Sequence, residues 1–173
     1  MLTLPVLVRG INNLSDARYC AGMGAAGLIF TLDPALPGAI APETVRELAG
    51  WVAGVELLGE FGPTLPAADV NRLVAECGLS RVLLSAADAA GSTRAAAPNE
   101  LAVPVLPVAA YSTDALAVDL TGRWLLGSFG PADLPALLAA RPAGLILEGG
   151  DELKPGLRDF TELGTLFEAL EVA

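Results

Sequence analysis

The segment PVLVRGINNLSDARYCAGMGAAGLIFTL spans residues 5–32 and decides the fold that the sequence predicts. Its first apolar run, 6–8, stops at Arg9 as a short buried strand does. Asn13 is suited to cap a following helix, which ends in a pair of glycines. A second apolar run, 27–30, begins another buried strand. A strand, a helix and a strand of this length form a parallel, right-handed unit.

Two charged residues follow these predicted strands. Arg9 comes directly after the first strand, and Asp33 follows the second. In parallel α/β folds, functional groups gather at the carboxyl ends of the strands. Arg9 and Asp33 are therefore expected at the edge of the sheet where chemistry would take place.

Composition restricts the class of protein. The chain has 173 residues, 53% of them apolar, and a formal net charge of −10. This length predicts one domain, residues 1–173, and is short for a complete barrel of eight βα units, which takes roughly 200 residues or more. The negative charge argues against nucleic acid and anionic membrane surfaces as partners. No run approaches a membrane span and no leader pattern is present, so a cytoplasmic protein is expected.

Few residues suited to metal or nucleophilic chemistry are present. The chain has no histidine and two cysteines, Cys20 and Cys77, which fall in helical patterns. Buried free thiols are the expectation for both, because unpaired cysteine is among the most buried residue types and disulfides are rare in the cytoplasm. The sequence predicts no metal site and no other cofactor.

The rest of the chain continues the alternation of strands and helices. Residues 86–100 are weakly patterned and fit either a short helix or a loop. Residues 111–123 are too few to form a helix, a strand and a ligand-binding loop. Within this segment, residues 115–120 fit a short strand and residues 113–120 fit one or two helical turns equally well. Predicted strands cover 54–61, 81–85, 103–109 and the segments starting at 124 and 144. Glu56 and Glu60 interrupt the strand at 54–61, and one of the two is expected to face the barrel mouth; Pro104 and Pro107 indicate interruptions or an edge position in the strand at 103–109. Predicted helices cover 42–52, 66–77 and the segments starting at 131 and 159.

The opening motif VRGINNLSDARYCAGMGAAGLIF resembles the start of phosphoribosylanthranilate isomerase, a barrel enzyme of tryptophan biosynthesis. Members of that family usually carry Lys-Ile-Cys-Gly-Ile-Thr here, then a helix opening Asp-Ala. Later segments, WLLGSFGP at 124–131 and KPGLRD at 154–159, also resemble the family in the same order. The positions that match in the opening motif are Gly10, Ile11, Asp16, Ala17, Gly24, Ala25 and Phe30.

This resemblance implies an α/β fold of the TIM-type (βα)8 barrel. The chain is shorter than such a barrel, so one helix or βα unit is expected to be trimmed around residues 86–123. The resemblance covers residues 5–85 and 124–170.

The resemblance also implies a changed active site. Family members use a cysteine and an aspartate as base and acid in an Amadori rearrangement. Arg9 stands in place of the cysteine, and an arginine cannot act as a base because it stays protonated at any working pH. Gly38 replaces a loop arginine, and Ser85 replaces a histidine. If 115–120 is a strand, Asp119 lies near the position of the family's catalytic aspartate and is the catalytic candidate; the alternative is a solvated loop aspartate.

Ligand-binding candidates come from the ends of the first strand and the last two strands. An ion pair between Arg9 and Glu148 is expected across the barrel mouth, since the first and last strands of a closed barrel are neighbours; Glu56 or Asp33 is the fallback partner. In the competing view, Arg9 anchors a carboxylate or phosphate of a ligand. The full set of candidates is Arg9, Gly127, Ser128, Glu148, Gly149 and Gly150.

Three functions follow from these patterns. The first is an isomerase-like barrel that has lost the activity and binds a small molecule or a protein partner. The second is a true phosphoribosylanthranilate isomerase that uses other residues, and the third is a new enzyme with Asp119, Glu148 or Glu56 as acid or base. A homodimer is a further expectation, since a trimmed barrel leaves apolar surface for a partner to cover.

Overall fold

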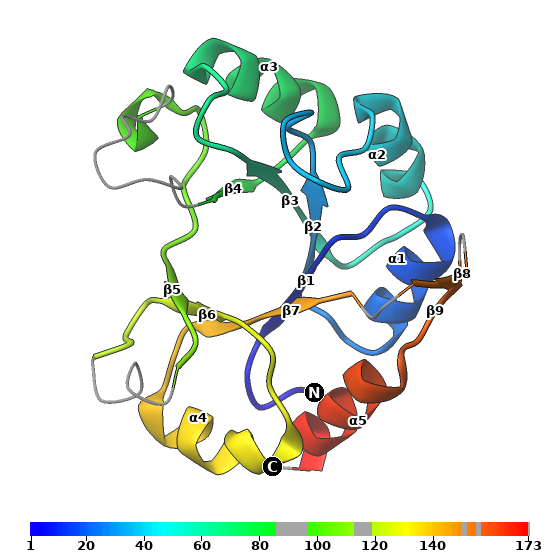
Figure 1. Cartoon of the computed structure of the whole chain (residues 1–173), viewed down its shortest axis with the longest axis vertical. Helices are drawn as coiled ribbons and strands as arrows, with labels where there is room; N and C mark the ends of the chain where they lie inside the picture. Colours follow the sequence, from blue (N-terminus) through cyan, green and yellow to red (C-terminus); the bar gives the residue numbers. More distant parts are fainter. Residues whose placement is uncertain (86–96, 113–118, 150–151, 155–156, 173) are drawn as a thin grey trace.

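The computed structural model describes residues 1–85, 97–112, 119–149, 152–154 and 157–172. Strands occupy the centre of the molecule and helices surround them (Figure 1). In chain order the first half contains β1 (Val6–Arg9), α1 (Leu14–Gly22), β2 (Gly27–Thr31), α2 (Pro42–Ala49), β3 (Glu56–Phe61), α3 (Ala67–Cys77) and β4 (Arg81–Leu84). The second half contains the short turn η1 (Pro98–Glu100), β5 (Val108–Ala110), β6 (Trp124–Leu126), the turn η3 (Pro131–Asp133), α4 (Leu134–Ala140), β7 (Gly144–Glu148), the hairpin β8 (Glu152–Lys154) with β9 (Leu157–Arg158), and α5 (Thr161–Val172).

The predicted barrel is confirmed in shortened form. Seven strands form one sheet in the order β4-β3-β2-β1-β7-β6-β5, and every pairing in it is parallel. The sheet curls so that its two edges approach each other, and one isolated parallel bridge, Val82 to Val105, joins β4 to the segment that leads into β5. The trimming falls between β4 and β6, where the described residues contain one three-residue strand and the turn η1.

The opening segment folds as the sequence predicts. The Asn13 side chain accepts a hydrogen bond from the Asp16 backbone N–H at 2.9 Å, which caps α1. Gly24 lies in the connection from α1 to β2 and has a φ of +89°, a backbone conformation that favours glycine. The strand predicted at 103–109 is an interrupted edge strand, as Pro104 and Pro107 indicated, because proline provides no N–H for a ladder. Regular pairing there begins at Val108.

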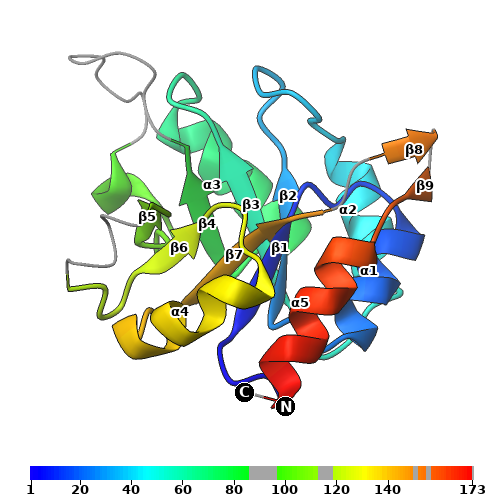
Figure 2. The same cartoon turned by 60° about the horizontal axis from the view of Figure 1, so that its bottom comes forward.

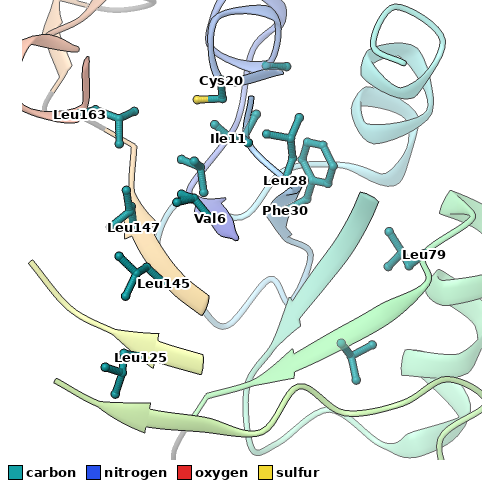
Figure 3. Close-up of a cluster of buried hydrophobic side chains, with 14 of the residues drawn as sticks. Val6, Ile11, Cys20, Leu28, Phe30, Leu79, Leu125, Leu145, Leu147 and Leu163 are labelled. Atoms are coloured by element: carbon teal, nitrogen blue, oxygen red, sulfur yellow. The ribbon is translucent and has the colours of Figure 1, made fainter. Parts of the chain in front are cut away.

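The outer face of the sheet carries the larger core. Alternate residues of the strands point outward and pack against the surrounding helices, as Val6, Leu28 and Leu145 do (Figure 3). Cys20, on α1, lies in this same layer. The segment before β1 lies beside the end of α5 (Figure 2), where the Thr3 backbone N–H donates to Leu170 O at 3.1 Å.

The inner face of the sheet is layered. Its middle is an apolar cluster with one member from each strand or its approach: Leu7, Ile29, Leu58, Leu83, Leu106, Trp124 and Ile146. Below this cluster, at the amino end of the strands, Glu56 pairs with Arg81, whose guanidinium lies 5.4 Å from the Trp124 ring centroid. Above it, at the carboxyl end, lie Arg9 and Glu60. The barrel interior is thus apolar in the middle and charged at each end.

A glycine on the inner face offers the first test of this packing. A Cβ added at Gly144 would overlap the Trp124 ring and lie 2.5 Å from the Pro5 carbonyl oxygen. Gly144→Ala is therefore expected to lower the free energy of unfolding by about 1–3 kcal/mol. Gly22→Ala is the matched control, since a Cβ there meets nothing within 4 Å; it should leave stability unchanged or raise it by up to about 1 kcal/mol. Urea denaturation of both variants measures the difference, and equal effects would contradict the packing.

The Glu56–Arg81 pair offers a second test. Hydrogen bonding from Arg81 holds the pKa of Glu56 below its ordinary value. The stabilisation is therefore present above the ordinary pKa of about 4.3 and is lost as pH falls through the lowered folded value. We expect Glu56→Gln to lower the free energy of unfolding at pH 7 by about 1–3 kcal/mol, and this deficit to shrink in acid. Asp69→Asn, in an exposed pair with Arg72, should change it by less than about 1 kcal/mol. A deficit independent of pH would count against the pair.

Candidate active site at the barrel mouth

Strand register places Arg9 and Glu148 side by side. Arg9 is the last residue of β1 and Glu148 the last of β7, and the two are direct partners in the β1–β7 ladder. Arg9 Nη1 lies 3.1 Å from Glu148 Oε1, so the predicted ion pair is confirmed. The backbone continues this contact, because the Gly149 N–H donates to Arg9 O at 3.0 Å.

A second carboxylate holds Arg9 from inside the barrel. Arg9 Nη2 donates to Glu60 Oε1 at 2.9 Å, and the Thr31 hydroxyl donates to Glu60 Oε2 at 3.3 Å. Thr31 and Glu60 are partners in the β2–β3 ladder. Glu60 is 3% exposed, whereas the Glu148 side chain is 57% exposed. One guanidinium therefore bridges a buried carboxylate and an exposed one.

Burial governs the protonation of Glu60. Loss of water around the carboxyl group raises its pKa above the ordinary glutamate value, and the neighbouring Glu148 adds to the rise. The Arg9 charge and the Thr31 hydrogen bond oppose the shift without cancelling it. Glu60 thus takes a proton more readily than an ordinary glutamate does.

A cavity of about 390 Å³ lies beside this cluster. It brings together four of the predicted ligand-binding residues, Gly127, Ser128, Glu148 and Gly149, at the carboxyl ends of β6 and β7. The fifth, Arg9, adjoins it through Glu148; Gly150 lies outside the described residues. The remaining lining residues are Phe129, Leu147, Asp159, Glu162, Leu163 and Leu166.

The start of α5 forms one wall of the cavity and is acidic. Asp159 Oδ1 accepts the Thr161 backbone N–H at 2.9 Å, and hydrogen bonding from Thr161 holds the pKa of Asp159 below its ordinary value. Glu162 follows on the first turn of the helix and is exposed. With Glu148, three carboxylates border the cavity.

The structure does not bring Asp119 to the mouth. Asp119 is exposed, and its Oδ1 accepts the Thr121 backbone N–H at 2.9 Å in the turn that leads into β6. That turn enters the amino end of β6, whereas Arg9 lies at the carboxyl end of β1. Residues 115–118 of the alternative strand lie outside the described residues. The position of Asp119 therefore does not support a catalytic role.

Neither of the two fallback partners, Glu56 and Asp33, pairs with Arg9. Glu56 lies at the opposite end of β3 and binds Arg81, because two glutamates four positions apart on one strand share a face but not an end. Asp33 is buried, and its carboxylate accepts hydrogen bonds from two backbone groups, the Ala35 N–H at 2.9 Å and the Gly62 N–H at 2.8 Å.

One of the two glutamates in the predicted strand at 54–61 was expected to face the barrel mouth, and the structure shows that it is Glu60 and not Glu56. The alternation of β3 carried a signal: Leu58 is apolar and inward, so residue 60 faces the same way one step nearer the mouth. What the sequence did not reveal is that β2, which separates β1 from β3, presents only Gly27, Ile29 and Thr31 on that face. Arg9 therefore reaches across β2 to Glu60.

Neither a cluster of metal ligands nor a membrane-spanning helix occurs in the described parts of the chain. No group of three His, Cys, Asp or Glu side chains there is placed to hold a metal ion. In the same residues, no helix combines the length and apolarity that crossing a membrane requires.

Arg9→Met tests the cluster. It leaves Glu60 buried without a cation, so the free energy of unfolding should fall by about 2–3 kcal/mol at pH 7. Without the cation, the pKa of Glu60 is higher in the folded chain than in the unfolded chain. This difference stabilises the folded state below the ordinary pKa of glutamate, and the stabilisation is lost as pH rises through the folded pKa. The deficit should therefore shrink between pH 7 and about 4.3 in denaturation series. Glu148→Gln, at the exposed partner, should cost less than about 1 kcal/mol. A deficit for Arg9→Met that stays constant with pH would show that Glu60 is not buried against Arg9.

Comparison with known proteins finds phosphoribosylanthranilate isomerases among the similar solved structures. No protein-family model matches the chain, and no curated protein matches it in sequence. Phosphoribosyl anthranilate isomerase from Thermus thermophilus is 26% identical, with 98% of this chain and 99% of that one covered and a TM-score of 0.79. The enzyme from Thermotoga maritima is 18% identical, with 99% and 100% covered and a TM-score of 0.75. That from Pyrococcus furiosus is 13% identical, with 98% and 100% covered and a TM-score of 0.73. Over its whole length, this chain is similar in structure to phosphoribosylanthranilate isomerases.

Proposed function

We propose that this chain is a phosphoribosylanthranilate-isomerase-like barrel without isomerase activity, and that its mouth binds a small molecule. The observation that carries the proposal is Arg9, held between Glu60 and Glu148 at 2.9 and 3.1 Å. By the resemblance in sequence, that position belongs to the cysteine of the isomerase.

The chemistry of the isomerase reaction supports the loss of activity. A base must remove a proton, and a guanidinium has no free basic site at working pH. No other thiol replaces the missing one: Cys20 and Cys77 are 0% and 5% exposed and lie in the helix layer. The chain has no histidine to take over the role.

The cavity supports a binding role. Its volume of about 390 Å³ falls within the range of about 300–1,000 Å³ that is usual for small-molecule sites. Its three carboxylates disfavour a doubly charged phosphosugar, because like charges at short range repel strongly where water is partly excluded. A ligand of this cavity is therefore expected to differ from the isomerase substrate.

A new enzyme on the same scaffold is the second candidate, and Glu60 favours it. Glu60 is buried and its pKa is raised, while Glu148 is exposed on the other side of the same guanidinium. Two carboxyl groups in unlike environments form the pattern of an acid and base pair. Turnover of any sugar or carbonyl substrate that is lost in both Glu60→Gln and Glu148→Gln would favour this candidate.

The proposal predicts no isomerase turnover. The purified chain, incubated with phosphoribosylanthranilate, should consume it no faster than buffer does. The chain should also fail to support growth of a bacterial strain that lacks the isomerase. The Thermus thermophilus enzyme, assayed in parallel, serves as the positive control. Turnover at an ordinary enzymatic rate, or rescue of growth, would overturn the proposal and establish an isomerase that uses other residues.

A further inference from the structure

We propose that the cavity beside Arg9 binds a small zwitterion, an amino carboxylate, and that its carboxylate takes the place of Glu148 on the Arg9 guanidinium. Glu148 is then a displaceable part of the protein that occupies the carboxylate position when no ligand is bound. This inference rests on the proposed binding function and names the class of ligand. Three features of the mouth carry it: a fixed guanidinium, an exposed carboxylate on that guanidinium, and an acidic wall.

The guanidinium is fixed from within. Glu60, 97% buried as a residue, receives the hydrogen bond from Arg9 Nη2. Thr31 in turn bonds the other oxygen of Glu60, so the carboxylate is itself held in place. The Arg9 side chain is 26% exposed, and its Nη1 faces Glu148 at 3.1 Å. One edge of the guanidinium is therefore oriented by buried groups, and the other contacts Glu148, which lines the cavity.

Glu148 is suited to leave this position. Its side chain is 57% exposed and lines the cavity, whereas Glu60 is enclosed. An ion pair with a largely exposed partner contributes little to stability, so its loss costs little. A ligand carboxylate in the same place makes the same charge-assisted contact with Arg9. When the ligand carboxylate replaces Glu148, Arg9 still has two carboxylate partners, because Glu60 remains paired with it.

The acidic wall selects a ligand that also carries a positive charge. Asp159 and Glu162 line the cavity, and the described lining residues include no lysine or arginine. A ligand with a carboxylate alone meets these groups as like charges. An ammonium group on the same ligand turns that repulsion into attraction, and Glu148 becomes a further partner for it once it leaves Arg9. Leu147, Leu163 and Leu166 supply apolar contact for a short carbon chain between the two charges.

The test compares matched probes on the intact chain at pH 7. The probes are ω-amino acids from glycine to 6-aminohexanoate, together with butyrate and butylamine as singly charged partners of 4-aminobutyrate. Binding is followed by amide NMR shifts, with the Gly149 signal as the reporter of the mouth. The best amino acid should bind about tenfold more tightly than butyrate or butylamine, because it makes one more charged contact than either. Equal affinities, or no binding by any probe, would overturn the inference.

Variants separate the roles of the residues. Arg9→Met should remove the advantage of the amino acid over butylamine. Glu148→Gln should tighten butyrate binding several-fold, because it removes the competing carboxylate. Glu47→Gln is the matched control, since Glu47 is exposed on α2 and its loss changes the net charge equally. Equal tightening in both variants would show an effect of bulk charge and overturn the displacement of Glu148.

Isomerase turnover is measured separately, so absence of both turnover and probe binding refutes only this inference, whereas turnover refutes the proposed function.

Discussion

The charge of Arg9 is the constraint on which the mouth of this barrel depends. A guanidinium keeps its proton at any working pH, and this one lies above an apolar layer that contains Leu7 and Ile29. It therefore requires carboxylate partners nearby. Glu60 and Glu148 meet that requirement from opposite sides, one from β3 and one from β7. The pairing joins three strands of the sheet and determines which groups remain for a ligand.

The fold itself depends on a different set of contacts. Outward residues such as Val8 and Phe30 are fully buried beneath the helices, and the inward apolar layer fills the middle of the barrel. Charged groups are confined to the two ends, where Arg9 and Arg81 each have carboxylate partners. Since the apolar layers provide most of the driving force for folding, the residues at the mouth are free to differ between barrels of the same shape.

This division explains what the sequence predicted and what it did not. The parallel unit, the Asn13 cap and the Arg9–Glu148 pair were predictable, because periodicity fixes elements and neighbouring strands meet in a barrel. One of Glu56 and Glu60 was expected at the mouth, but the contact of Glu60 with Arg9 was not predicted, because it depends on the register of two ladders and on the short Thr31 side chain of the strand between them. Asp119 was placed by analogy with a strand, whereas its own hydrogen bond to Thr121 holds it in a turn.

A cation at a strand end is not an isolated change. A neutral thiol at the position of Arg9 would need no partner, whereas a guanidinium beside an apolar layer would be costly without one. The two glutamates therefore belong with the arginine as one set, and removing any member alters the charge that the others meet. The exposed edge of Arg9, the raised pKa of Glu60 and the solvent-facing Glu148 are the polar groups that this set presents. Any ligand or reaction at the mouth must begin from them, because the chain's two sulfhydryl groups lie buried in the helix layer.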